Sequence, residues 1–187
     1  MTHRQRHEEF YHVGNGVLIQ YRAWIFAAAV FGLATPALAC RPAPPGLIQA
    51  ALAAHNEARR IVGVPPLAWS EALACGAQAW GEHLANIGGR TLAHSAPEQR
   101  DHAGENLWMG SKARYSLQQM IGSWADERRF YNGAPIGNSN FQAVGHYTQM
   151  IWRQTTKVGC EIVGSRATDI LVCRYSPAGN IINQRPY

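Results

Sequence analysis

The spacing of apolar residues predicts three helices in the first two thirds of the chain. Apolar positions recur every three or four residues, the period of a helix face, in each of them. The predicted helices span residues 46–62, 70–86 and 116–131. Gly63 ends the first helix, and Ser70 is a favourable N-cap for the second. In the third, Met120, Trp124 and Glu127 lie at i, i+4 and i+7, so a carboxylate shares a face with two large apolar residues.

Alternation of apolar and polar residues predicts strands near the end of the chain. The predicted strands span residues 146–152, 157–163 and 169–176. The sequence GSRAT between the last two is typical of a turn. If that hairpin folds symmetrically, Cys160 lies directly opposite Cys173, where Cβ atoms approach within about 4.5–5.5 Å. Helices followed by clustered antiparallel strands favour the α+β class.

The N-terminal region has the pattern of an export signal. Arg22 precedes the apolar run 23–34, and Ala-Leu-Ala follows at 37–39. A basic flank, a short apolar run and an A-x-A motif are typical of a secretory signal peptide. The run is shorter than the roughly 20 residues of a membrane span. We therefore expect residues 1–39 to be cleaved, leaving one domain, 40–187, with no stable membrane span.

Two alternatives for this region stay open. Translation could start near Val17, and Cys40 could carry a lipid, because the residues before it faintly resemble a lipoprotein box. In an exported chain, four cysteines favour disulfides. The hairpin pairs Cys160 with Cys173 and leaves Cys40 to pair with Cys75. The alternative for Cys75 is a buried free thiol.

Composition indicates a globular protein and gives no sign of a nucleic-acid partner. The chain of 187 residues is 47% hydrophobic and 16% charged. Removing residues 1–39 takes away three Arg and two Glu and leaves a net charge of +4. Its basic residues are scattered, so no basic patch favours nucleic acid. The sequence therefore predicts a secreted, extracellular or periplasmic protein, which we expect to be a monomer.

Four sequence blocks resemble the CAP superfamily of cysteine-rich secretory proteins, antigen 5 and pathogenesis-related proteins. They are HNEAR with VGVPPLAWSEAL, HS with GENLWMG, GHYTQMIWRQTTKVGC, and VCRYSPAGNIINQRPY, all within residues 47–187. The chain is most similar to the plant pathogenesis-related branch. The resemblance implies a three-layer α-β-α sandwich with a central antiparallel sheet and a cleft.

The resemblance also implies a cleft tetrad of two histidines and two glutamates. Carried onto matching motifs, these are His94, Glu105, Glu127 and His146. We expect His94 and Glu105 in loops, Glu127 on a helix and His146 at the start of a strand. Neutral imidazoles of His94 and His146 are good ligands for a divalent metal, zinc foremost, and the glutamates could fix their tautomers. The alternative is a hydrogen-bonded network that only orders the structure.

Three functions follow from the resemblance. The first is a binding or interaction module with a protein or lipid ligand and a tetrad that holds a divalent metal. The second is sterol or fatty-acid binding and export, for which the loop 131–144 offers apolar residues; these residues could equally pack on the sheet. The third is a metal-dependent, protease-like hydrolase, in which Glu105 or Glu127 acts as base on a metal-bound water. Ser95 beside His94 is a weak nucleophile candidate, and we assign no catalytic residue.

Overall fold

The computed structural model describes residues 40–187, so the predicted signal peptide lies outside the described part of the chain. The elements within it are α1 (Pro45–Ile61), β1 (Ala68–Trp69), α2 (Glu71–Asn86), a 3₁₀ helix η1 (Pro97–Arg100), β2 (Gly104–Ser111), α3 (Leu117–Ala125), a second 3₁₀ helix η2 (Asp126–Phe130), α4 (Phe141–Met150), β3 (Lys157–Gly164) and β4 (Thr168–Ser176). None of the described helices is long and apolar enough to cross a bilayer.

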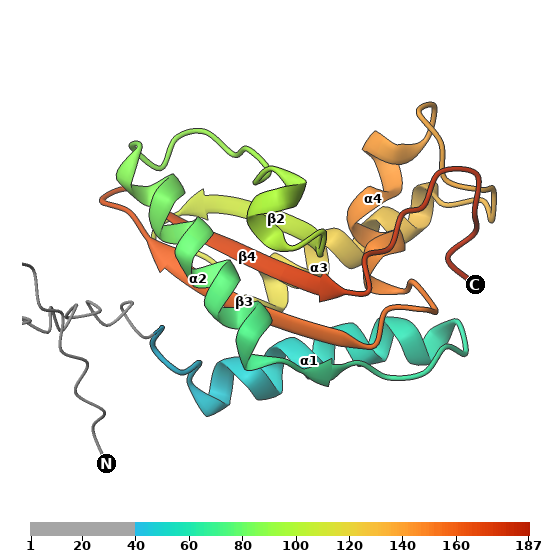
Figure 1. The fold of residues 1–187 in the computed structure, drawn as a ribbon, viewed down its shortest axis with the longest axis horizontal. Helices are drawn as coiled ribbons and strands as arrows, with labels where there is room; N and C mark the ends of the chain where they lie inside the picture. The colour runs from blue at the N-terminus through green and yellow to red at the C-terminus, as the bar shows by residue number, and fades with distance from the viewer. Residues whose placement is uncertain (1–39) are drawn as a thin grey trace, which may run out of the picture. The chain divides into compact units, whose positions relative to one another are not determined.

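Two layers of helices enclose one sheet, which confirms the α-β-α sandwich. The strand order is β1-β3-β4-β2. Helix α2 lies across one face, where Ala77 and Leu84 pack on Val172; Figure 1 shows it in front of the strands. Helices α1, α3 and α4 supply most of the larger core on the opposite face, including Met120 and Trp124. The three main strands are antiparallel as expected, but β1 pairs parallel to β3, so the sheet is mixed.

The β3–β4 hairpin has the register expected from its turn. Cys160 lies opposite Cys173, and the two form a disulfide with a Cα–Cα distance of 4.1 Å. Both cysteines are fully buried under α1 and α3. A second disulfide joins Cys40 to Cys75, with a Cα–Cα distance of 5.3 Å. It ties the first described residue to α2.

The predicted strand 146–152 is wrong, because this segment belongs largely to helix α4. Tyr147, Thr148, Gln149 and Met150 are all at most 2% exposed. A helix that is buried on every side shows no polar face, so its sequence carries no 3.6-residue period. Apolar and polar residues alternate by chance in HYTQMIW, and no helical period was present to argue against a strand.

The predicted loop placement of Glu105 is also wrong, because GENLWMG forms the edge strand β2. This strand pairs with β4 over its full length. Two glycines and an asparagine lower the strand propensity of the segment. The long antiparallel pairing with β4 overrides this local preference. The third predicted helix, by contrast, is found as α3, capped by Ser116 and continued by η2.

Arg59 anchors the end of α4 to α1. Arg59 lies on the same face of α1 as His55 and is 1% exposed. The guanidinium donates to the carbonyls of Met150 at 3.0 Å, Trp152 at 2.9 Å and Thr155 at 2.9 Å. No carboxylate of the described chain pairs with it. Burial lowers the pKa of the Arg59 guanidinium to about 10.

Candidate functional site

The first half of the candidate site joins a loop histidine to a strand carboxylate. His94 lies in the loop between α2 and η1, and Glu105 is the second residue of β2. The Nδ1–H of His94 donates to Oε1 of Glu105 at 3.0 Å. The histidine side chain is 53% exposed and that of the glutamate is 0% exposed. The carboxylate therefore orients the ring from below while the ring faces solvent.

Glu105 accepts hydrogen bonds from other groups in addition to His94. Ser95 donates its backbone N–H to Oε1 at 2.9 Å and its hydroxyl to Oε2 at 2.8 Å. The Arg174 guanidinium donates to Oε2 at 3.3 Å from the neighbouring strand β4. Burial raises the pKa of Glu105, but the hydrogen bonds from His94 and Ser95 and the charge of Arg174 outweigh it and lower the pKa below its usual value. The carboxylate is ionised at neutral pH.

The second half of the site joins η2 to α4. The Nδ1–H of His146 donates to Oε1 of Glu127 at 2.6 Å. The other carboxylate oxygen accepts the backbone N–H groups of His146 and Tyr147, each at 3.0 Å. The imidazole stacks on Trp124, with 5.9 Å between ring centroids and 12° between planes. One carboxylate and one indole therefore fix the ring, which is still 35% exposed.

Both histidines have the same hydrogen-bonding arrangement. Because Nδ1 carries the proton that each glutamate accepts, the lone pair of each neutral ring lies on Nε2. Among residues 40–187, neither Nε2 atom makes a hydrogen bond. The glutamate oxygens are already occupied by donors, so they support the rings rather than extend the ligand set. No group of three or more His, Cys, Asp or Glu suited to a metal occurs in this range.

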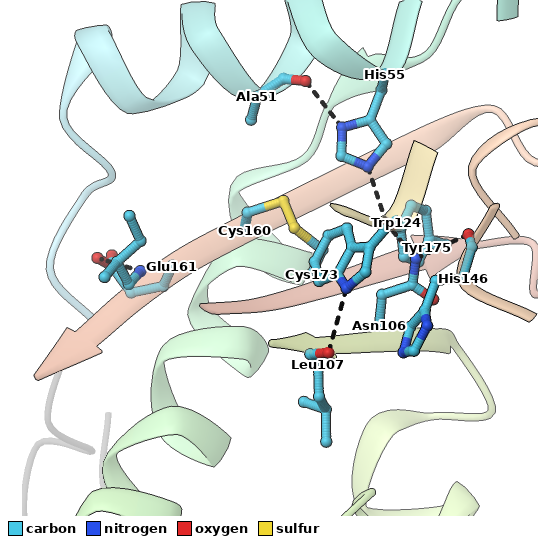
Figure 2. The surroundings of a disulfide bond; sticks show 11 residues. Ala51, His55, Asn106, Leu107, Trp124, His146, Cys160, Glu161, Cys173 and Tyr175 are labelled. Atoms are coloured by element: carbon cyan, nitrogen blue, oxygen red, sulfur yellow. Dashed lines mark hydrogen bonds between the residues drawn. A yellow bond between two sulfur atoms is a disulfide. The ribbon is translucent and has the colours of Figure 1, made fainter. Parts of the chain in front are cut away.

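A buried hydrogen-bond chain, shown in Figure 2, links α1 to the backbone of His146. The Nδ1–H of His55 donates to the Ala51 carbonyl at 2.8 Å, which leaves Nε2 to accept from the Tyr175 hydroxyl at 2.8 Å. Asn106 donates to that hydroxyl at 3.1 Å and to the His146 carbonyl at 3.1 Å. Every donor in this chain has one assigned acceptor.

The sequence gives no sign that His55 bonds to Tyr175 or that Tyr175 in turn bonds to Asn106. Asn106 follows Glu105 on β2, so the two side chains point to opposite faces of the sheet. The strand thereby supports both halves of the site: Glu105 holds His94, and Asn106 holds the backbone of His146. A polar residue next to a candidate glutamate on a strand was the signal that could have found it.

Comparison with known families assigns the chain. The family model described as "CAP: Cysteine-rich secretory protein family" matches residues 52–175. The chain belongs to this family. Its sequence relatives include pathogenesis-related protein 1B of Nicotiana tabacum, 38% identical over 137 residues that cover 73% of this chain and 78% of the tobacco protein. Pathogenesis-related protein 1 of Arabidopsis thaliana is 36% identical over 164 residues, or 87% and 93% of the two chains.

An animal relative is similar over a smaller share of its length. GLIPR1-like protein 1 of Bos taurus is 38% identical over 152 residues, which are 75% of this chain and 62% of the bovine protein. The CAP domain described here thus spans less than two thirds of that relative.

Solved structures share the CAP fold at low sequence identity. A crystal structure of NaASP2 with Zn²⁺ matches with a TM-score of 0.65 and 24% identity, over 80% of this chain and 90% of that one. The crystal structure of hookworm platelet inhibitor matches with a TM-score of 0.64 and 18% identity, over 80% and 79%.

Ser95 is not arranged as a nucleophile in this CAP domain. Its side chain is buried, and its hydroxyl donates to Glu105 and not to His94. His94 also uses Nδ1 for Glu105. A serine nucleophile needs a base that accepts its proton, and here that acceptor is a carboxylate already bound by Arg174. The serine therefore helps to hold Glu105 in place.

A groove lies between α1 and η2, lined by the sequence neighbours of Glu127 and His146 but not by these two residues themselves. Its volume is about 370 Å³. Its lining residues are Ala54, Glu57, Ala58, Ile61, Ala125, Asp126, Arg128, Arg129 and Tyr147. The walls combine small apolar residues and a tyrosine with two adjacent arginines and two carboxylates, Glu57 and Asp126. The apolar part of this lining suits an elongated apolar molecule, and the arginines are the groups that could contact an anionic head.

The loop 131–144 offers less apolar surface than its sequence indicates. Ile136 and Val144 are 0% and 1% exposed and pack on Trp152. Phe141 alone among the large apolar residues of this loop is substantially exposed. The interpretation that these residues pack in the interior therefore fits most of the loop, and the groove between α1 and η2 is the better place for an apolar ligand.

Proposed function

We propose that this CAP domain is exported and works as a binding module that holds a divalent metal, zinc foremost, through Nε2 of His94 and His146. The observation that carries the proposal is the pair of solvent-accessible imidazoles, each with its Nδ1–H fixed by a carboxylate, fully buried in Glu105 and 18% exposed in Glu127. Metal-binding histidines almost always have such a carboxylate or carbonyl behind them. The two disulfides are consistent with an oxidising compartment.

A site with two imidazole ligands leaves coordination positions open. Zinc is usually four-coordinate in proteins, so water or a partner molecule would complete its coordination. The zinc in the similar NaASP2 crystal structure supports this choice of metal. Open positions suit a module that recruits a ligand through the metal. They would also permit hydrolysis by a bound water, but Glu105 and Glu127 already accept several hydrogen bonds, which argues against either as a general base.

Zinc titration of the purified protein tests the proposal. We expect His94→Ala and His146→Ala each to weaken zinc binding at least about tenfold, and the double variant to abolish it, because each removes one of two ligands. Isothermal titration calorimetry at neutral pH measures the affinity. His83→Ala and His102→Ala, at exposed positions, are the matched controls. Zinc affinity that survives in the double variant would show that the two imidazoles are not the ligands.

A second candidate function is lipid binding in the groove between α1 and η2, which the shape and lining of the groove favour. An acyl chain would lie along Ala54, Ala58 and Ile61, with its carboxylate near Arg128 or Arg129. A ligand bound there has no need of the metal. The two candidate functions can therefore be tested separately.

Displacement of a fluorescent fatty acid tests the groove. Ala54→Trp is expected to reduce binding at least about tenfold by filling the groove, because lost burial of a few methylenes already costs about 0.8 kcal/mol each. Ala53→Trp, one residue along α1 and exposed outside the groove, is the matched control. Saturable binding that is equal in both variants would place the lipid elsewhere. Absence of any saturable signal would exclude this function.

A further inference from the structure

An exposed apolar corner forms where the start of α4 meets the segment after β4, visible in Figure 1 as the red end of the chain beside α4. Phe141, Ile181 and Ile182 are 44%, 42% and 53% exposed there. Asn180 links the two elements by donating to the Gly145 carbonyl at 2.8 Å, and the Phe141 ring lies beside the same glycine. Single exposed apolar residues are common, but three held close together indicate an interaction surface.

Two exposed arginines belong to the same region. The backbone N–H of Arg153 donates to the Pro186 carbonyl at 2.7 Å, and Nε of Arg185 donates to the Gly133 carbonyl at 2.8 Å. These bonds fasten the segment after β4 onto the turn that follows α4 and onto the loop that precedes it. We call Phe141, Ile181, Ile182, Arg153 and Arg185 the apolar–basic corner.

The chain around this corner carries no negative side chain. Neither residues 128–160 nor residues 170–187 contain any Asp or Glu. The same stretches contain six Lys and Arg residues, namely Arg128, Arg129, Arg153, Lys157, Arg174 and Arg185. Protein surfaces normally intersperse the two signs. The segments that build the corner therefore provide no counter-charge for its arginines.

We propose that the apolar–basic corner docks on an anionic lipid bilayer. Phe141, Ile181 and Ile182 insert among the headgroups, and Arg153 and Arg185 contact lipid phosphates. Exposed apolar side chains beside cations are the combination that binds at a membrane interface. Each cation near an anionic membrane surface contributes about 1 kcal/mol. This surface is separate from the two histidine–glutamate pairs and does not depend on a bound metal.

Co-sedimentation of the purified protein with lipid vesicles tests the docking. We expect the protein to sediment with mixed phosphatidylcholine–phosphatidylglycerol vesicles and not with phosphatidylcholine alone. Binding should weaken as added salt shortens the Debye length from about 10 Å at 0.1 M to about 3 Å at 1 M. The double variant Arg153→Glu/Arg185→Glu should lower the partition coefficient at least about tenfold. The triple variant Phe141→Ser/Ile181→Ser/Ile182→Ser should lower it comparably at low salt, because insertion is lost.

Matched controls change the same properties elsewhere on the surface. Arg114→Glu/Arg166→Glu alters net charge equally, and Ile87→Ser removes an apolar residue that is 60% exposed at the C-cap of α2. Both should bind vesicles nearly as the unmodified protein does. Circular dichroism checks that all variants are folded.

Three outcomes would overturn the proposal. The first is equal sedimentation with neutral and anionic vesicles. The second is corner variants that bind no worse than their matched controls. The third is retention on immobilised polyglutamate without any binding to vesicles, which would assign the corner to an acidic protein instead of a bilayer.

Discussion

Replacing Arg59 with Met is expected to lower the free energy of unfolding by about 3–5 kcal/mol. The substitution keeps an apolar stem of similar length but removes the guanidinium donors to the carbonyls of Met150, Trp152 and Thr155. The Trp152 carbonyl still accepts the Thr155 N–H at 3.0 Å, so the main loss falls on the carbonyls of Met150 and Thr155. Buried acceptors left without partners cost about 1–3 kcal/mol each, and partial relaxation and the removal of a buried charge offset some of that loss. Urea unfolding at neutral pH measures the difference.

Arg60→Met is the matched control for this prediction. Arg60 is the next residue on α1 and is exposed, and its one partner among residues 40–187 is Glu57, at 2.8 Å. Exposed ion pairs contribute about 0–1 kcal/mol, so this variant should unfold almost as the unmodified protein does. If Arg59→Met were as stable as Arg60→Met, the contacts of the buried guanidinium would not be holding the end of α4 in place.

Acid should destabilise the protein through His55 by about 3 kcal/mol between pH 6.5 and pH 4. Burial lowers the pKa of this imidazole from 6.5 to about 4, because a charged ring would be desolvated beneath α1. The folded state therefore stays neutral while the unfolded chain takes up a proton. Stability attributable to the neutral ring is complete above about pH 6.5 and is lost as the pH falls towards 4.

The hydrogen bonds of His55 also predict that protonation of its ring destabilises the folded state. A protonated ring would donate from both nitrogens, but Tyr175 needs Nε2 as the acceptor for its hydroxyl and already accepts from Asn106. His55→Gln should flatten the loss of unfolding free energy between pH 6.5 and 4, whereas His83→Gln, at an exposed position, should not. Glu105, whose pKa is lowered from 4.5, loses its contribution to stability mainly below about pH 4.5 and does so in every variant, so the comparison isolates the ring. A slope unchanged in His55→Gln would contradict the assignment.

The parts of the fold that the sequence predicted are those with a strong local period. The three helices are amphipathic, and the final hairpin joins two apolar strands by a clear turn. Each of these elements was found within a few residues of its true bounds, although the third helix continues as a 3₁₀ helix. The register of the hairpin followed from its turn, which placed Cys160 opposite Cys173. Helix α4 was missed because it is buried on all sides and its sequence therefore has no helical period. Strand β2 was missed because its glycines and asparagine are weak strand formers.

The candidate site was predictable only in its residue types. Motif resemblance located His94, Glu105, Glu127 and His146, but not that each glutamate serves one histidine. The role of Arg59 was missed although it follows His55 at i+4 on the buried side of α1. Because charged residues are rarely buried without a partner, an arginine at this position is expected to be exposed to solvent. Its partners are backbone carbonyls from a distant segment, and no sequence pattern records those.

The double role of Glu127 has an evolutionary consequence. Its carboxylate orients the His146 ring and also accepts two backbone N–H groups of α4. Selection for folding alone would therefore retain this glutamate in a relative whether or not that relative binds metal. The presence of these glutamates in another chain of this family would therefore indicate a conserved fold. Loss or gain of metal binding would instead appear as substitutions of the two histidines. A variant made to test the proposed metal site should accordingly change the imidazole rings and leave the carboxylates intact.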